Sequence, residues 1–364
     1  MIPLSIPHLN GNELKYVTEC IETGWVSSAG SYVSKFEQLV ADWAGCKYGV
    51  ATSNGTAGLH LAMHMIGIEE GDIVLLPNIT FIASANAVAY TKATPVFIDV
   101  DSETWQMDLD LLEEWLDKNN SPKVKAVMPV HVLGNMCDMP RLMDMAYRHG
   151  LHVIEDSTEA LGSYWKGKSA GSFGVMNVFS FNGNKIITTG GGGVIVTNDE
   201  SHAKRAKHLS TQSKVNPETY YHDEIGFNYR LVNILAALGV AQMEQLPDFI
   251  QRKKYIDAYY RKTLKGVGDI QFQKVVEEVD PNCWLFTFYS EKQETILKTL
   301  KENSIIARPF WFPMNQLPMF QESEYFNHSD NSRRIHSNCL SIPSSVNLTD
   351  SELSKVVEVI KSCF

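Results

Sequence analysis

The chain has 364 residues, 44% of them hydrophobic, and carries 32 Lys and Arg against 42 Asp and Glu. This composition excludes the disordered, collagen-like and coiled-coil classes and predicts a globular protein. The net charge of −10 at pH 7 argues against nucleic acid or an anionic membrane as a partner, so an anionic ligand would have to be held by local groups.

Short apolar segments alternate with helical patterns between about residues 45 and 200. Apolar residues at helical spacing predict helices over residues 56–66, 109–116 and 139–147. Continuous apolarity, which a sheet covered on both faces requires, predicts buried strands over residues 73–77, 95–99, 126–130, 152–156, 178–181 and 194–197. The alternation predicts an α/β fold whose helices connect parallel strands.

The pattern changes after about residue 235. It predicts a long amphipathic helix over about residues 242–264, a strand over 284–289, a helix over 293–302, an apolar pair at 305–306 and a terminal helix over about 350–362. This order is typical of a smaller α+β domain. We therefore predict a large domain over residues 1–245 and a small domain over residues 246–364, with a boundary uncertain by about ten residues.

Several classes of site and location are disfavoured. No segment approaches the roughly 20 apolar residues that span a bilayer, and the first five residues do not resemble a signal peptide, so we expect a cytoplasmic protein that does not contact membranes. The six cysteines are scattered without a CxxC pair, which disfavours a disulfide framework and a structural zinc site. His60 and His64 lie four residues apart without an HExxH motif, so we expect no metal.

Asp156 is the first candidate for chemistry. The predicted strand over residues 152–156 ends in Glu155 and Asp156. In an open α/β sheet, ligands bind beyond the carboxyl ends of the strands, which places Asp156 beside a ligand. The alternative is that Asp156 only caps the turn that follows.

Lys185 is the second candidate, because it lies between apolar segments. A buried ammonium is costly unless it is paired or neutralised, and a buried lysine is a candidate for Schiff-base chemistry. The alternative is a solvated loop lysine. The four glycines at 190–193 fit neither GxGxxG nor the P-loop pattern.

Other segments are ambiguous when taken alone. Residues 53–59 are small and polar residues that lead into a helix, whose first amides could bind phosphate or could simply be capped by Ser53 or Thr56. Phe81 follows the strand over residues 73–77, where its ring could cover a planar heterocycle or belong to the core. His131 has the same ambiguity.

Together these signals specify one cofactor. A pyridine aldehyde that carries a phosphate needs a lysine for the imine, an acid for the ring nitrogen, an anion cradle and a stacking ring. Lys185, Asp156, residues 53–57 with Ser180, and Phe81 would fill these roles for pyridoxal 5′-phosphate.

An ordered set of motifs also makes the chain resemble the nucleotide-sugar aminotransferases of the DegT/StrS family. The resemblance spans nearly the whole chain through GNE at 11–13, TGWVSS at 23–28, SNGTA at 53–57, PVH at 129–131, ED at 155–156, GSFG at 171–174, residues 179–193, GFNYR at 226–230, and RP at 308–309. It implies a fold type I pyridoxal-phosphate enzyme with a mostly parallel mixed sheet covered by helices, and a homodimer whose active sites are shared across the interface.

The resemblance also implies roles for single residues. Lys185 forms the internal aldimine, Asp156 holds the pyridinium nitrogen, and Phe81 stacks on the ring. The phosphate is bound by Gly55, Thr56, Ala57, Ser180 and, from the second subunit, Asn228. Candidate substrate contacts are Trp25, Ser27, His131, Tyr229, Arg230, Arg308 and Trp311. Arg308 and Trp311 could contact a sugar or pyrophosphate, or could instead form a surface ion pair and core packing.

Glu159 departs from many family members, which have Gln or His three residues after the aspartate. A carboxylate near the phenolate oxygen of the cofactor would be repulsive unless it were protonated or bridged by water. The perosamine-synthase branch is similar in carrying Glu there, so we interpret Glu159 as a mark of that subgroup.

The resemblance implies a ping-pong transamination. L-Glutamate leaves as 2-oxoglutarate, and its amino group passes to carbon 4 of a nucleotide-linked 4-keto-6-deoxy sugar. The N-terminal segment 2–7 and residues 343–348 favour UDP-2-acetamido-4-keto-2,6-dideoxyglucose as that sugar. The alternative is GDP-4-keto-6-deoxymannose, which would make the protein a GDP-perosamine synthase.

Three other classes are weighed. A sugar dehydratase on the same scaffold would have histidine at position 185, and Lys185 argues against it. A regulatory protein without cofactor would have a degraded site, yet the expected cofactor residues other than Glu159 are all typical. An unrelated Rossmann oxidoreductase would need a glycine-rich turn after its first strand, and none fits.

Overall fold

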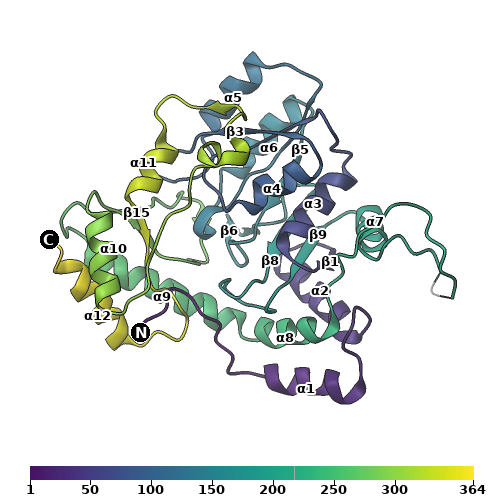
Figure 1. Cartoon of the computed structure of the whole chain (residues 1–364), viewed down its shortest axis with the longest axis horizontal. Coiled ribbons are helices and arrows are strands. Elements are labelled where there is room, and N and C mark those ends of the chain that lie inside the picture. The colour runs from purple at the N-terminus through teal and green to yellow at the C-terminus, as the bar shows by residue number, and fades with distance from the viewer. Residues whose placement is uncertain (217) are drawn as a thin grey trace.

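A computed structural model describes residues 1–216 and 218–364 (Figure 1). Its largest element is an eight-stranded mixed sheet in the order β1-β9-β8-β5-β4-β2-β3-β14. Neighbouring strands from β8 to β14 are parallel, whereas β9 is antiparallel to both β8 and β1. The strands are β1 Tyr48–Thr52, β2 Ile73–Pro77, β3 Thr94–Ile98, β4 Val124–Val127, β5 His152–Asp156, β8 Met176–Ser180, β9 Gly193–Thr197 and β14 Tyr325–Phe326.

The predicted α/β class is confirmed, and all six predicted strands are present. Two of them, β2 and β5, have the predicted bounds, and the others differ by one to three residues at an end. Two strands of this sheet were not predicted. β1 is an edge strand, and β14 is a two-residue strand from the C-terminal third of the chain that pairs with β3.

Helices cover both faces of this sheet because alternate strand residues point to opposite sides. Leu76 packs with Leu59 on one face, whereas its neighbour Leu75 packs with Leu112 and Leu142 on the other. The helices are α1 Glu13–Thr23, α2 Ser31–Trp43, α3 Gly55–Met65, α4 Ala83–Tyr90, α5 Leu109–Lys118, α6 Met139–Arg148, α7 Glu200–Ser210 and α8 Asn233–Met243. A 3-10 turn, η1, covers Val132–Gly134.

A second, antiparallel sheet has the order β10-β12-β15-β13. Its strands are Gln271–Phe272, Thr287–Tyr289, Cys339–Ser341 and Arg308–Pro309, and it packs with α9 Leu246–Leu264, α10 Gln293–Glu302 and α12 Asp350–Lys361. The remaining elements are α11 Asn331–Asn338, the 3-10 turns η2 Met314–Gln316 and η3 Pro318–Phe320, and a three-stranded sheet of β11 Val279–Asp280, β6 Tyr164–Trp165 and β7 Lys168–Ser169.

Two predicted elements of the C-terminal region are wrong in extent. The predicted helix over 242–264 is the end of α8 followed by α9, which begins at Leu246 with Pro247 in its first turn, where a proline fits. The predicted strand over 284–289 is paired only from Thr287, so residues 284–286 are not part of the strand.

The division into domains 1–245 and 246–364 stays a prediction. The boundary at residue 245 falls between α8 and α9. Two segments cross it, because Ile2 pairs with Ile305 and β14 joins the large sheet.

A search of residues 1–216 and 218–364 finds no helix with the length and apolarity that crossing a bilayer requires. The longest helix, α9, carries charged residues along its length.

Candidate active site

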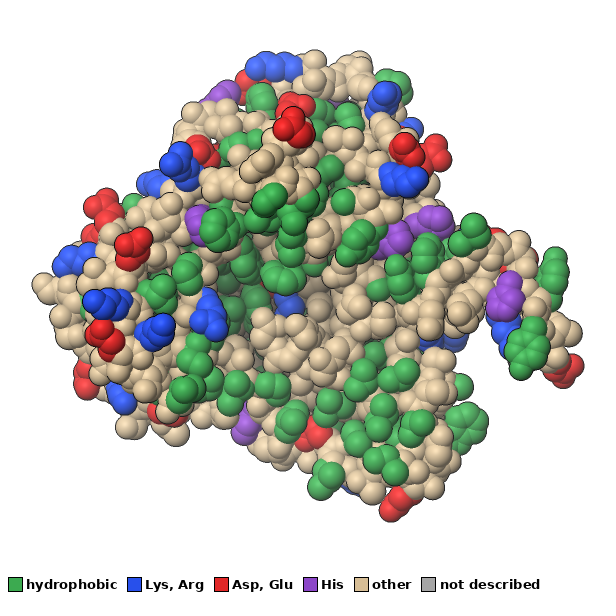
Figure 2. All heavy atoms as spheres, in the orientation of Figure 1, with side chains coloured by type: hydrophobic (Ala, Val, Ile, Leu, Met, Phe, Trp, Pro, Cys, Tyr) green, Lys and Arg blue, Asp and Glu red, His purple; other side chains and the backbone are tan. Residues whose placement is uncertain are grey.

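A cavity of about 580 Å³ lies at the carboxyl ends of the parallel strands, against the four-stranded sheet. Figure 2 shows this part of the surface as a hollow with many hydrophobic side chains. Both sheets and the loop over 182–185 contribute walls. Eight of the predicted site residues line the cavity: Gly55, Thr56, Phe81, Glu159, Ser180, Lys185, Arg308 and Trp311.

Lys185 reaches the cavity from the turn that follows β8. Its backbone N–H donates to the carbonyl of Asn182 at 3.0 Å, and only 11% of its side chain is exposed. Its Nζ lies 3.7 Å from a carboxyl oxygen of Glu159 and 4.3 Å from the ring centroid of Trp284. The amine is therefore held between an acid and an aromatic face rather than in solvent.

Asp156 ends β5 and is 3% exposed. One carboxylate oxygen accepts from the Ser84 hydroxyl at 2.6 Å, and the other accepts from the Thr158 N–H at 3.2 Å. These donors, one from α4 and one from the turn after β5, fix the carboxylate beside the cavity. This fixed carboxylate suits a ring nitrogen that must be kept protonated.

The start of α3 forms a cradle on the cavity wall. The Asn54 side chain caps the helix by accepting from the Ala57 N–H at 2.8 Å, so the amide of Ala57 is already used. The amides of Gly55 and Thr56 are in the first turn, where a helix supplies no backbone acceptor. A Cβ at Gly55 would lie 2.9 Å from Cβ of Ser180, so only glycine lets the hydroxyl of Ser180 approach the helix start.

These groups fit pyridoxal 5′-phosphate. The cradle offers two amides and a hydroxyl at the positive end of a helix dipole, which suits a phosphate. Lys185 offers an amine and Phe81 an aromatic ring on the cavity wall, and Asp156 offers an acid next to that wall, where it accepts from the amide of the cavity-lining Thr158.

Glu159 is buried, and its Oε2 accepts from the Leu133 N–H at 2.8 Å. Burial raises the pKa of Glu159 to about 7, although Lys185 and the Leu133 amide oppose the shift. The carboxyl group therefore keeps its proton up to near-neutral pH. This relieves the repulsion expected between a carboxylate and a phenolate at this position.

Two predicted substrate contacts lie away from the cavity and have buried partners. His131 Nε2 pairs with Glu155 at 2.9 Å, and the same carboxylate accepts from the amides of residues 171, 173 and 174. The guanidinium of Arg230 pairs with Glu37 and donates to the Ala51 carbonyl at 3.2 Å. In this structure both side chains hold the backbone around the site.

Four further predicted residues lie outside the cavity of their own subunit. Trp25 is 59% exposed on the connection after α1, and Ser27 is also exposed there. Asn228 is exposed next to Tyr229, whose ring stacks on Phe227 at 4.9 Å.

Among the residues that were not predicted are Ser84 and Thr158, which bond to Asp156, and Trp284, which contacts the Lys185 amine. Thr158 could have been found, because an aspartate commonly accepts from the amide two residues later. Trp284 gave no such signal, since its apolar neighbours are typical of a strand.

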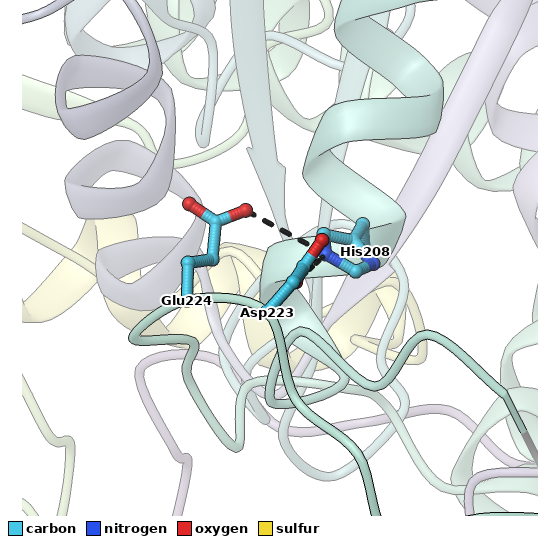
Figure 3. A group of neighbouring side chains, drawn as sticks. All are labelled: His208, Asp223 and Glu224. Atoms are coloured by element: carbon cyan, nitrogen blue, oxygen red, sulfur yellow. Dashed lines mark hydrogen bonds and ion pairs between the residues drawn. The ribbon is translucent and has the colours of Figure 1, made fainter.

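The described residues also include one group of possible metal ligands, His208, Asp223 and Glu224 (Figure 3). His208 Nε2 lies 2.8 Å from Asp223 and 3.5 Å from Glu224. The Arg205 guanidinium also pairs with Glu224 at 2.6 Å, so Glu224 already has a cationic partner. The group fastens residues 223–224 to α7.

Comparisons with known proteins agree on the class of protein. The DegT/DnrJ/EryC1/StrS aminotransferase family matches residues 7–361. A GDP-perosamine synthase of Escherichia coli O157:H7 is 43% identical over 324 residues, which cover 88% of this chain and 87% of that protein. Another, from Caulobacter vibrioides, is 37% identical, with 99% and 97% covered. The crystal structure of a DegT DnrJ EryC1 StrS aminotransferase from Brucella abortus superposes with a TM-score of 0.91 at 25% identity, with 96% of this chain and 95% of that chain covered.

The raised pKa of Glu159 predicts a pH-dependent stability difference for Glu159→Gln. Between the ordinary pKa of 4.5 and about 7, the unfolded wild type releases a proton that the folded protein keeps, so the wild type loses stability as pH rises. Gln does not titrate. The free energy of unfolding of E159Q relative to that of the wild type should therefore rise by up to about 3 kcal/mol from pH 5 to pH 8.

Chemical denaturation of the cofactor-free full chain at matched protein concentration measures this difference. Glu302→Gln, on the exposed side of α10, is the control and should show no such pH dependence. A difference between E159Q and wild type that stays constant from pH 5 to pH 8 would contradict the prediction.

Proposed function

This chain belongs to the DegT/DnrJ/EryC1/StrS aminotransferase family, and on that basis we propose that it moves the amino group of L-glutamate to carbon 4 of GDP-4-keto-6-deoxymannose. The chain is a pyridoxal-phosphate-dependent aminotransferase of sugars, as its family and its relatives show. One observation carries the proposal. A single cavity is lined by the Lys185 amine, by the buried carboxyl of Glu159 and by the start of α3, whose first amides can bind a phosphate.

The residues that would hold the cofactor come from separate elements. The phosphate would lie against the amides of Gly55 and Thr56 and the hydroxyl of Ser180, and the ring nitrogen against Asp156. When bound, pyridoxal phosphate supplies an electron sink for the carbanion that forms at the α-carbon of the amino donor.

Lys185 is the proton carrier in this proposal. Its Nζ would take the proton from the α-carbon of glutamate, because no other amine lines the described part of the cavity. Glu159, 3.7 Å from Nζ and with a pKa of about 7, can exchange a proton with it near neutral pH. The ring of Trp284 excludes water from one side of the amine.

The relatives support one choice of nucleotide and sugar. Two proteins that align with most of this chain, at 43% and 37% identity, are named GDP-perosamine synthase. They favour GDP-4-keto-6-deoxymannose over the UDP-linked acetamido sugar that the terminal motifs suggested. Arg308 and Trp311 line the cavity and are available to contact the sugar or the diphosphate.

Replacing the catalytic amine tests the reaction. Lys185→Ala should lose the visible absorbance of covalently held pyridoxal phosphate and should lower turnover by roughly 10³-fold or more, because both covalent attachment and proton transfer are removed. Lys168→Ala, an exposed lysine on β7, is the control. Full turnover in K185A would refute the assignment.

A substrate panel tests the sugar. The enzyme and glutamate are incubated with GDP-, UDP- and dTDP-linked 4-keto-6-deoxy sugars, and the aminated carbon of each product is located by NMR. We expect the highest kcat/KM with the GDP sugar and amination at carbon 4. Preference for the UDP-linked acetamido sugar would select the alternative, and reaction of a 3-keto sugar alone would remove the carbon-4 claim.

A homodimer is part of the proposal. The arm over residues 211–216 and 218–228 projects from the body beside α7 (Figure 1) and exposes 93% of Tyr220 and 87% of Ile225. Leu14 and Ile21 on α1 are 80% and 62% exposed. Apolar patches of this kind mark interfaces, and a second copy would cover them while receiving Asn228.

Subunit mixing tests the shared site. Lys185→Ala and Asn228→Asp should each have little activity, the second because a carboxylate repels the phosphate. After subunit exchange, one site in each mixed dimer combines an intact Lys185 with an intact Asn228. Activity should recover to about a quarter of wild type. No recovery, with mixed dimers verified by mass spectrometry, would contradict a site built across the interface.

A further inference from the structure

Lys253 is a buried lysine for which the proposed reaction has no use. It lies in the middle of α9 with 2% of its surface exposed. Its Nζ donates to the carbonyl of Trp284 at 2.8 Å and to the carbonyl of Ser344. Both acceptors are neutral, and a buried ammonium without a carboxylate is costly compared with an apolar side chain of the same size.

The two carbonyls belong to segments that flank the small sheet. Residues 284–286 lead into β12, and residues 342–344 follow β15. Because its carbonyl bonds to Lys253 and its N–H donates to Asn282 Oδ1 at 3.0 Å, Trp284 has both backbone groups held by side chains. This is the physical reason why the predicted strand begins three residues late, at Thr287.

The indole of Trp284 is directed at Lys185. Its Nε1–H donates to the carbonyl of Asn184 at 2.7 Å, and the Ser5 hydroxyl donates to the same carbonyl at 3.2 Å. The ring centroid lies 4.3 Å from Nζ of Lys185. Trp284 therefore contacts both the backbone next to the lysine and the end of its side chain.

We propose that Trp284 is a positioning residue that confines the Lys185 amine for attachment to the cofactor, and that Lys253 in turn fixes Trp284. The proposal rests on the proposed function of Lys185. A lysine side chain has four rotatable bonds, so an unrestrained amine samples many positions, and confinement removes that entropic cost before the reaction.

The chemistry that depends on this confinement is simple. The nitrogen of Lys185 replaces the aldehyde oxygen of pyridoxal phosphate, and that oxygen leaves as water with the two protons of the neutral amine. The indole face attracts the Lys185 side chain while it is protonated, and it holds the neutral amine at the cavity wall by packing. Without the ring, or without the Lys253 bond to the Trp284 carbonyl that orients the ring, the amine would sample more positions and would meet the aldehyde less often.

The test follows attachment of the cofactor to full-length protein. Wild type and variants are stripped of cofactor and reloaded with pyridoxal phosphate, and the visible absorbance gives the attachment rate per folded subunit. Borohydride trapping and peptide mapping identify the attached lysine. Trp284→Leu should attach roughly tenfold more slowly, Lys253→Met several-fold more slowly, and Trp284→Phe, which keeps an aromatic face, less slowly than W284L.

Tyr260→Phe is the matched control. Tyr260 also lies buried on α9, its hydroxyl donates to the Pro343 carbonyl at 2.9 Å, and its ring centroid lies 5.0 Å from that of Phe286. Y260F should destabilise the small sheet to a degree similar to that of the Trp284 and Lys253 variants, yet it should attach the cofactor at the wild-type rate. If W284L or K253M does not fold, the comparison between the attachment rates of W284F and Y260F decides the test.

The outcomes separate this inference from the proposed function. Wild-type rates in the Trp284 and Lys253 variants, or an equal slowing in Y260F, overturn the positioning role while leaving Lys185 in place. Trapping of the cofactor on a residue other than Lys185 in the wild type refutes the proposed function itself.

Discussion

The contact between the Lys185 amine and the Glu159 carboxyl is the interaction on which the site depends. The two groups lie 3.7 Å apart with little exposure to solvent, and burial raises the pKa of Glu159 to about 7. An acid in this condition can share or release a proton near neutral pH. The pair therefore holds a titratable proton beside the amine, which a transaminase needs when it moves protons between carbon and nitrogen.

The large sheet provides the frame for that contact. Parallel strands end at one edge, so the turn after β5 and the turn after β8 bring Glu159 and Lys185 to the same cavity, with Asp156 next to it at the end of β5. The start of α3 adds its free amides at this edge, and glycine at position 55 lets Ser180 approach them. Acid, amine and anion cradle are thus consequences of one topology.

The small sheet closes the cavity from the other side. Trp284 covers the lysine amine, and Arg308 and Trp311 come from β13 and the chain that follows it. Asn282 donates to the carbonyls of Glu159 and Leu161 at 2.7 and 3.0 Å, which ties this region to the acid. The buried amino group of Lys253, whose Nζ donates to the Trp284 carbonyl, connects this region to α9.

The sequence by itself determined the α/β class, the buried strands, and the candidate roles of Lys185, Asp156 and the helix start at residues 54–57. These features have local causes, because a continuous apolar run, an acid at its end and small residues before a helix are all visible within a few positions. The tertiary structure decided which distant groups meet. Arg230 pairs with Glu37, 193 residues away, and Trp284 reaches Lys185 because a buried lysine draws its backbone out of a strand. Such contacts depend on packing between segments that no local pattern relates, and they fix the surroundings of Lys185 and Glu159.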